Sequence, residues 1–391
     1  LLTLVIPAYA ADETPPSTSA GCAIVADAQT GQILYAKNID KRTFSPLPNR
    51  ILTVLASIQE GNLRNTVTTQ AAAISEDVVP RDMPNIAAEE NEIFVREDLL
   101  YAVLLTGAAD AANILASSNS TLPEFTNKIK TMAEQAGCTE TGIANANGRE
   151  AEGNFTSVKD ICNIVSAAYQ NEEFRTIWQT YDYIMTATEQ NGERTLISVC
   201  KPLSDGEYAY EYATGGTGGW AKNGNYSSAV TVDNGTQTLI CVLAECASPE
   251  SRWADTKALC EYFFNNYESF TYPAGDIEIP RQALTDTDGT ITSFVTGKAT
   301  EDITFLAPKS TTEQDVTISV NYDKDKRTFV IKALLQVSQP LYPEAIQVDA
   351  QTTEKSASFI SRITKGSTVG AVFLIAGIVI GAIIIIVAAL F

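Results

Sequence analysis

The chain contains no histidine, and this restricts the pairs of nucleophile and base that its residues could form. Without imidazole, Ser-His-Asp and Cys-His pairs and histidine metal sites are excluded. A base would have to be lysine, tyrosine, a carboxylate or a cysteine-only metal site. The seven cysteines show no metal-ligand spacing such as C-x-x-C. We therefore expect no metal and no cofactor, and we interpret most of the cysteines as small buried apolar residues.

The segment from Ser45 to Thr53 has the outline of a nucleophile at a helix start, but it lacks the side chains. It reads Ser-Pro-Leu-Pro-Asn-Arg-Ile-Leu-Thr. Leu47 is followed one helical turn later by Arg50, and these positions share one helix face. Leucine has no lone pair, and arginine cannot act as a base because its pKa exceeds about 12. Ser45 has Pro48 three residues later, which accepts no proton.

Apolar periodicity predicts a sheet flanked by helices over residues 20–270. The strand-like runs are Cys22–Asp27 and Gln32–Lys37, which a turn ending in Gly31 joins as a hairpin, then Ser227–Val232 and Thr238–Ala244. Helical patterns run from Pro48 to a stop at Gly61, over Leu99–Leu115 with an interruption at Thr106-Gly107, and over Glu124–Gly137, Val158–Tyr169 and Ser251–Phe264.

Short alternating strands predict a small all-β domain over residues 271–350. Its strands are expected at Thr290–Phe294, Ile303–Leu306, Val316–Val320 and Thr328–Leu335. A polar linker is expected over 351–367. The run 368–391 carries no charge and is long enough to cross a bilayer as a helix. Residues 1–10 are typical of the end of a signal peptide, with a small-x-small site at Ala10.

The excess of acidic over basic residues limits the classes of molecule that the protein is expected to bind. The chain carries 27 basic and 47 acidic residues, a formal net charge of -20. A surface this acidic repels phosphate backbones, so we expect no nucleic-acid partner. An exported signal and a membrane-spanning run together predict a single-pass membrane protein whose globular part lies outside the cell membrane.

Five segments, in this order, resemble the serine D-alanyl-D-alanine carboxypeptidase family, the low-molecular-mass penicillin-binding proteins. They are the hairpin Ala23–Asn38, the helix Asp98–Leu105, Asp110-Ala-Ala112, the turn Asn145-Ala-Asn-Gly148, and Arg252 with Asp255. The resemblance implies a penicillin-binding-protein or β-lactamase-like α/β (α+β) transpeptidase domain, followed by a β-rich domain and a membrane anchor. It also implies a bacterial, cell-wall setting.

That family's chemistry needs S-x-x-K, S-x-N and K-T-G around one cleft. Compared with those motifs, this chain has Leu47 and Arg50 at the nucleophile and base positions. Gly107 and Ala109 stand where S-x-N is expected. Gly216 stands at the lysine position of K-T-G, followed by Thr217 and Gly218. No catalytic residue is therefore expected to function, and Thr217 and Gly218 are the remaining candidates for ligand binding.

Three interpretations stay open at this point. The first is a membrane-anchored pseudoenzyme that binds a peptidoglycan stem peptide or an envelope protein. The second is an active serine carboxypeptidase that uses non-standard residues, Ser45 among them. The third is a structural tether whose cleft Leu47 has closed.

Overall fold

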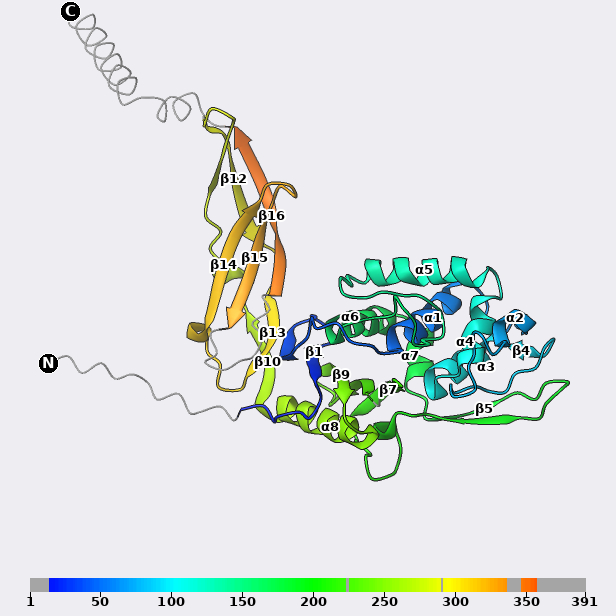
Figure 1. The fold of residues 1–391 in the computed structure, drawn as a ribbon. Helices are drawn as coiled ribbons and strands as arrows, with labels where there is room; N and C mark the ends of the chain where they lie inside the picture. The colour runs from blue at the N-terminus through cyan, green and yellow to red at the C-terminus, as the bar shows by residue number, and fades with distance from the viewer. Residues whose placement is uncertain (1–13, 223–224, 290, 336–345, 357–391) are drawn as a thin grey trace, which may run out of the picture. The chain divides into compact units, whose positions relative to one another are not determined.

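The computed structural model describes residues 14–222, 225–289, 291–335 and 346–356. They form two compact units, and the first runs to Ser269 and includes Leu306–Ser310 (Figure 1). The predicted signal segment 1–10 and membrane helix 368–391 lie outside the described residues. Among the residues that are described, no helix combines the length and the apolar character needed to cross a bilayer.

Five antiparallel strands make the sheet of the first unit. Their order across the sheet is β2 (Ile33–Lys37), β1 (Cys22–Asp27), β9 (Thr238–Cys246), β8 (Tyr226–Asp233) and β7 (Ala213–Trp220). The β1–β2 turn closes as predicted, with Gly31 at φ 74° and the Thr30 N–H donating to Asp27 at 3.0 Å. The K-T-G-like segment is therefore an edge strand of this sheet.

Both faces of the sheet are buried, which explains why β9 is apolar along its length. Ile240 and Val242 face one core, and Cys241 and Leu243 face the other. Helix α8 (Pro249–Asn266) covers the second face, while α6 (Val158–Tyr169) covers the first (Figure 1). The prediction of a sheet between helices is confirmed.

The remaining helices gather on the α6 side of the sheet. They are α1 (Leu47–Gln59), α2 (Ala71–Ile74), α3 (Arg96–Tyr101), the π-helix η1 (Ala102–Thr106), α4 (Ala109–Ala116), α5 (Leu122–Gln135) and α7 (Glu172–Trp178). The predicted interruption at Thr106-Gly107 is real, since Gly107 ends η1 with φ 75°. Thr121 and Glu124 form a capping box that starts α5 two residues before the predicted boundary.

Two small two-stranded sheets were not predicted from the sequence. One pairs β3 (Thr66–Thr68) with β4 (Ile93–Val95), and the other pairs β5 (Asp182–Met185) with β6 (Arg194–Ile197). Their strands are only three or four residues long, too short for a period-2 pattern to stand out. The second is anchored at Arg194, whose guanidinium contacts both carboxylate oxygens of Glu92 at 2.8 and 3.1 Å.

The second unit is built on a five-stranded antiparallel sheet, in agreement with the predicted all-β texture. Its order is β11 (Gln282–Thr285), β12 (Ile291–Ala299), β16 (Ile346–Ser356), β15 (Thr328–Leu335) and β14 (Val316–Asp323). β13 (Ile303–Pro308) pairs instead with β10 (Tyr267–Tyr272). The predicted boundary at residue 350 needs correction, because β16 continues through 351–356, which had been assigned to the linker. Ladder pairing with β12 keeps these polar residues in the sheet.

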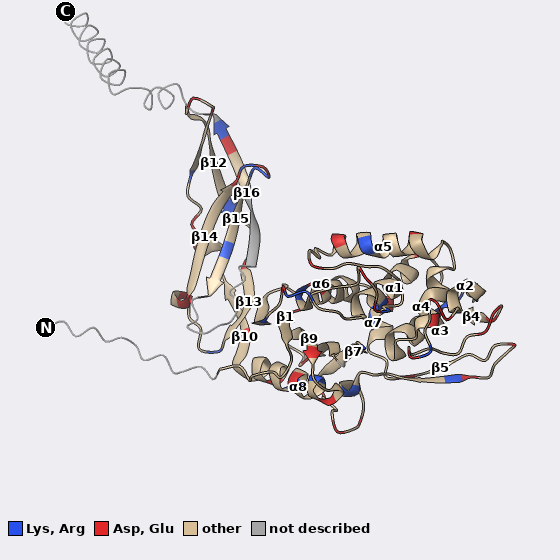
Figure 2. Cartoon of the chain, viewed as in Figure 1, with Lys and Arg blue, Asp and Glu red and all other residues tan. Residues whose placement is uncertain are grey.

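Charged side chains of both signs are distributed over the two units, as Figure 2 shows. Few charged side chains are buried in the cores. Asp110, Arg50 and Arg252 are all buried in the first unit. Because an unpaired buried charge is costly, each requires an account of its partners.

Candidate functional site

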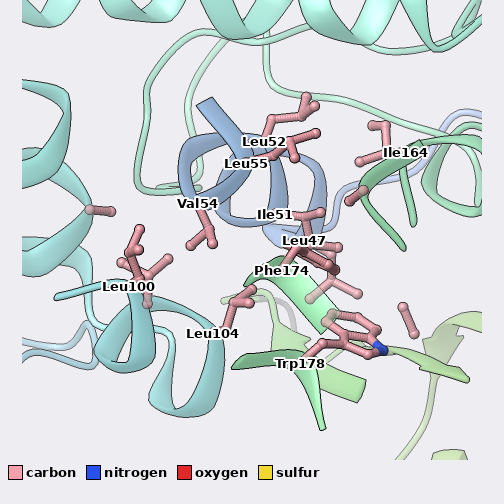
Figure 3. Packing of buried hydrophobic residues seen from close by; sticks show 14 of the residues in the cluster. Leu47, Ile51, Leu52, Val54, Leu55, Leu100, Leu104, Ile164, Phe174 and Trp178 are labelled. Carbon is pink, nitrogen blue, oxygen red and sulfur yellow. The ribbon is translucent and has the colours of Figure 1, made fainter. Parts of the chain in front are cut away.

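Leu47, at the nucleophile position, is part of the hydrophobic core. It is the first residue of α1, and its side chain is completely buried. Figure 3 shows Leu47 and Ile51 beside Phe174 of α7, with Trp178 close by. The helix start has Pro46 at its N-cap and no side-chain cap. This position therefore presents an aliphatic side chain to the protein interior.

Arg50, at the base position, is also buried, with 5% of its surface exposed. Its Nε–H donates to the carbonyl of Asn147 at 3.3 Å. Burial lowers the pKa of Arg50 to about 10, so the guanidinium remains charged near pH 7. A permanent cation one turn after Leu47 cannot accept a proton from any nucleophile.

One side of α1 is tied to the turn at Asn145–Gly148. Asn49 Nδ2 donates to the carbonyl of Asn145 at 2.6 Å, and Thr53 Oγ1 donates to the carbonyl of Ala146 at 2.8 Å. Gly148 has φ 75°, and a Cβ there would lie 2.7 Å from the Pro46 carbonyl oxygen. This turn of the family resemblance therefore positions α1, and its glycine is required by close approach.

The second motif has lost its polar side chains but keeps its backbone position. Gly107 faces Arg50: a Cβ at residue 107 would lie 2.4 Å from Arg50 Nη1. Ala109 is fully buried, and its N–H donates to the carbonyl of Pro84 at 2.8 Å. Neither residue offers a group that could relay a proton. Glycine at 107 gives the arginine its space.

Asp110, the polar residue that remains in this motif, has a structural role. Its carboxylate accepts backbone N–H groups of Ile86, Ala88 and Ala111, at 2.8 to 3.1 Å. Burial raises the pKa of Asp110, and these donors act in the opposite direction. Asp110 thus fixes the loop that contains Ile86 and Ala88.

The structure corrects the register of the third motif. A Cβ at Gly216 would lie 2.7 Å from Cys200 Sγ, on the face of β7 away from α1. Thr217 faces the other way, and its hydroxyl donates to the carbonyl of Leu104 in η1 at 2.8 Å. A lysine serving the cleft would have to stand at 217, not at 216. The error arose because alternation along the strand cannot be fixed from a glycine-rich sequence.

Of the two predicted ligand-binding residues, neither is available at the surface of the cleft. Thr217 is buried with its hydroxyl engaged. Gly218 lies against α8, since a Cβ there would be 2.9 Å from Arg252 Nη1. The Nη1 of Arg252 donates to the carbonyls of Gly219 and Ser227, both at 2.9 Å. Arg252 thereby clamps β7 to β8.

Two serines could in principle replace the missing nucleophile. The Ser45 and Ser227 hydroxyl oxygens lie 2.8 Å apart and both side chains are buried; the described residues place no lysine or carboxylate against Ser45. Ser198-Val-Cys-Lys201 has S-x-x-K spacing that was missed in the sequence. Its Ser198 hydroxyl accepts the N–H of Cys200 at 3.1 Å, and Lys201 is exposed in a 3-10 turn. Without an α-helix, the spacing does not bring the two side chains together.

Several residues that shape the site carry no recognisable sequence signal. Trp178 fills the space above β7: its indole N–H donates to Thr231 Oγ1 at 3.0 Å, and a Cβ at Gly215 would lie 2.0 Å from its ring. Trp220 ends β7 and is 41% exposed. Lys222 follows it and pairs with Asp82 at 3.2 Å. Only the fold brings these distant positions together.

The cysteines form no metal site and no disulfide within the described residues. None of the seven cysteines is part of a disulfide and six of them are buried, and no cluster of three metal-ligating side chains occurs in that part of the chain. Burial raises the pKa of Cys200 and of Cys246 to about 12. Such thiols are poor nucleophiles near neutral pH.

Comparison with known proteins tests the family resemblance that the sequence motifs indicate. A family model described as D-alanyl-D-alanine carboxypeptidase matches residues 9–245, more than half of the chain. The D-alanyl-D-alanine carboxypeptidase of Streptomyces sp. (strain K15) is 24% identical over 260 residues, which cover 64% of this chain and 89% of that protein. DacF of Bacillus subtilis (strain 168) is 22% identical over 249 residues, covering 63% and 62%. The chain thus spans a little less than two thirds of the Bacillus protein.

Solved structures show the same fold. The Streptomyces K15 DD-transpeptidase gives a TM-score of 0.59 at 24% identity, over 64% of this chain and 99% of that chain. Penicillin-binding protein 5 from Haemophilus influenzae gives 0.67 at 18% identity, over 88% and 99%. Together with the family match, the motif order and the α1, η1 and β7 geometry, this places the chain in the D-alanyl-D-alanine carboxypeptidase family.

Proposed function

We propose that this protein is a non-hydrolytic member of its family, a pseudoenzyme that binds an envelope component instead of cleaving it. The observation that carries the proposal is the pair Leu47 and Arg50: a fully buried aliphatic side chain where the nucleophile belongs, and a buried guanidinium where the base belongs. Removing a hydrolase nucleophile alone costs about 10⁶-fold in kcat. Here the base and the polar residues of the second motif are absent as well.

The binding partner we favour is a peptidoglycan stem peptide or another envelope protein. Its support is the retained scaffold: α1, the Asn145–Gly148 turn and the edge strand β7 still surround one site. Folds persist after the chemistry of their sites has been lost, so this support is for architecture and not for a particular ligand. The charge-free run at 368–391 supports anchoring at the outer face of a bacterial membrane.

A structural tether is the second candidate. The packing of Leu47 and Trp178 favours it, because both fill space near the former nucleophile. A tether predicts no change in melting temperature with D-Ala-D-Ala peptides, whereas a binder at saturating ligand is stabilised by mass action. The same thermal measurement therefore separates the two.

The decisive test of the enzymatic alternative is acylation by a labelled penicillin, together with release of D-alanine from a stem pentapeptide. We expect neither acylation nor release. A positive control is a catalytically intact relative assayed under the same conditions. Mass spectrometry of any labelled protein would identify the serine, and labelling of Ser45 or Ser198 would overturn the assignment of this chain as inactive.

A further inference from the structure

A small pocket lies between Arg50 of α1, the loop over residues 80–84, the turn over residues 148–150 and the residues 220–222 at the end of β7. Its volume is about 40 Å³. Arg50 lies at this pocket together with Arg149, and Lys222, Asp82, Glu150 and Trp220 also line it. A cavity this size admits a group of two or three heavy atoms, since one water needs roughly 10–15 Å³ by the same measure. Solvent is thus not the only species that fits.

Arg50 is a buried cation with no carboxylate partner among the described residues. Within the described part of the chain its side chain makes one hydrogen bond, from Nε to the carbonyl of Asn147, and neither terminal nitrogen has an acceptor. Leaving a charge buried and unpaired costs several kcal/mol in typical cases. A protein that retains such a group in a pocket is suited to an anion supplied from outside.

Two other buried arginines of this unit, Arg252 and Arg96, and the half-buried Arg194 provide the comparison. Arg252 is 7% exposed, but it donates to two carbonyls and packs 4.3 Å from the Trp253 ring. Arg194 contacts Glu92 at 2.8 Å. Arg96 lies 3.9 Å from Glu60. Arg50 differs from all three because it lines the pocket and, within the described residues, its terminal nitrogens have no hydrogen-bond acceptor.

The charges around the pocket reinforce this difference. The ammonium of Lys222 pairs with Asp82 at 3.2 Å, and the backbone N–H of Lys222 donates to the carboxylate of Glu150 at 3.4 Å. Arg149 adds a second guanidinium, whose Nε is buried and has no hydrogen-bond partner. The pocket is thus lined by three cations, Arg50, Arg149 and Lys222, against two carboxylates, in a chain whose formal net charge is -20.

We propose that this pocket binds a small carboxylate or similar oxyanion, held by the guanidinium of Arg50 with help from Arg149. The planar fork of an arginine matches the two oxygens of a carboxylate. Trp220, at the rim, offers an apolar surface to whatever carries the carboxylate. The anion would lie on the α1 side of the site, because β7 presents neither a lysine nor a free hydroxyl there.

This inference deepens the proposed function and rests on it, since it requires a cleft that binds rather than cleaves. It assigns Arg50 as the specificity-determining residue and a carboxylate-bearing compound as the ligand class. That ligand could be the end of a wall peptide or a free organic acid. Both carry the same group, and the test must tell them apart.

The experiment uses the intact protein and three probes at constant ionic strength: acetate, N-acetyl-D-alanyl-D-alanine, and the C-terminal amide of that dipeptide. Calorimetry measures affinity, and the Arg50 Nε–H signal in NMR reports the site directly. We expect the free carboxylates to bind and to shift that signal. The amide should bind at least about tenfold more weakly, a loss of about 1.4 kcal/mol.

Two variants compare the buried cation of the pocket, Arg50, with the exposed cation, Lys222. Arg50→Met keeps much of the side-chain volume without the charge and should lower carboxylate affinity by about tenfold or more. Lys222→Met removes an exposed cation at the same pocket and should change affinity by less than about threefold. Should Arg50→Met fail to fold, the NMR signal of the unmodified protein decides the question by itself.

The outcomes are distinct. Absence of any Arg50 shift with all probes, or equal affinity of Arg50→Met and the unmodified protein, overturns the carboxylate site. If the dipeptide and its amide bind with equal affinity and the Arg50 signal does not shift, the peptide-binding function is supported and the carboxylate site is contradicted. Acetate binding at Arg50 without dipeptide binding supports a site for a free acid and contradicts the wall-peptide function.

Discussion

The guanidinium of Arg50 occupies the space into which a side chain at Gly107 would extend. A Cβ on Gly107 would lie 2.4 Å from Nη1 and 2.8 Å from Cζ of Arg50. The two residues are 57 positions apart and belong to the first and second motifs of the family. Their substitutions are therefore physically coupled: the arginine is accommodated because the neighbouring motif has no side chain at that point.

Gly107→Ala is expected to destabilise the protein by more than backbone strain alone. The φ of 75° at Gly107 costs about 1–2 kcal/mol for an L-residue. Overlap with a buried guanidinium adds about 1–3 kcal/mol. Gly31→Ala is the matched control, because Gly31 has φ 74° and nothing within 4 Å of the added Cβ. Urea unfolding measures both variants.

The double variant Gly107→Ala/Arg50→Ala tests the contact itself. Removing the guanidinium should recover about 1 kcal/mol or more of the Gly107→Ala loss, a coupling in the range measured for residues in contact. Equal destabilisation by Gly107→Ala and Gly31→Ala, with no coupling to Arg50, would contradict the proposed contact.

Leu47→Ser should not restore an acyl-enzyme. It removes a fully buried side chain and leaves a hydroxyl in an apolar core, so we expect a loss of about 3–5 kcal/mol in unfolding free energy. Labelled penicillin should remain unattached, since Arg50 cannot accept the serine proton. Leu122→Ser is the control, because Leu122 also begins a helix but is only half-buried; its loss should be smaller.

Thr217→Val should weaken the junction between β7 and η1. The hydroxyl of Thr217 donates to the buried carbonyl of Leu104 at 2.8 Å. Losing this donor leaves that carbonyl unsatisfied, at a cost of about 1–3 kcal/mol. Thr217→Ser keeps the donor and should lose less. Thermal unfolding compares them, and a larger loss for serine than for valine would argue against the bond.

Stability of the first unit should fall at acidic pH through Glu92. Burial pushes the pKa of Glu92 up, but its hydrogen bonds outweigh burial and leave the pKa below the usual value. The donors are Thr188, the Glu89 backbone N–H, Arg194 and Asn191. Because the pKa of Glu92 is lower in the folded than in the unfolded state, its carboxylate stabilises the folded state fully at pH values above the unfolded-state pKa of about 4.3. This contribution is lost as pH falls through the folded pKa.

Glu92→Gln should therefore cost about 3–5 kcal/mol at neutral pH, because it leaves the Arg194 guanidinium without its counterion. The difference from the unmodified protein should shrink as pH falls below about 4. Glu76→Gln provides the control, since the Glu76–Arg81 pair is exposed and should contribute no more than about 0.5 kcal/mol. Urea unfolding between pH 3 and 7 measures both; a constant difference across that range would exclude the assigned role.

The helices with strong apolar periodicity could be predicted from the sequence. The boundaries of α6 (Val158–Tyr169) were predicted without error, and so was the interruption between η1 and α4 at Gly107. Both depend on local patterns of residues within one or two turns. The β5–β6 hairpin was missed because its strands are short and its stability comes from the distant Glu92–Arg194 contact.

Within the site, the residue types could be predicted but not their contacts. That residue 47 is not a serine and residue 50 is not a lysine is evident from the sequence. That Arg50 pairs with none of the described carboxylates, and that Gly216 faces Cys200, depends on the approach of elements far apart in the chain. A run of glycines in β7 carries no polar alternation from which the face could have been deduced.

The close approach of α8 to β7 at Gly218 limits which side chains this strand can carry. Replacing Gly218 with threonine would bring a Cβ to 2.9 Å from the Arg252 guanidinium, which fastens the carbonyls of Gly219 and Ser227. A larger side chain at position 218 would thus loosen the edge of the sheet. A variant designed to hold a substrate through β7 would therefore have to change Arg252 together with Gly218.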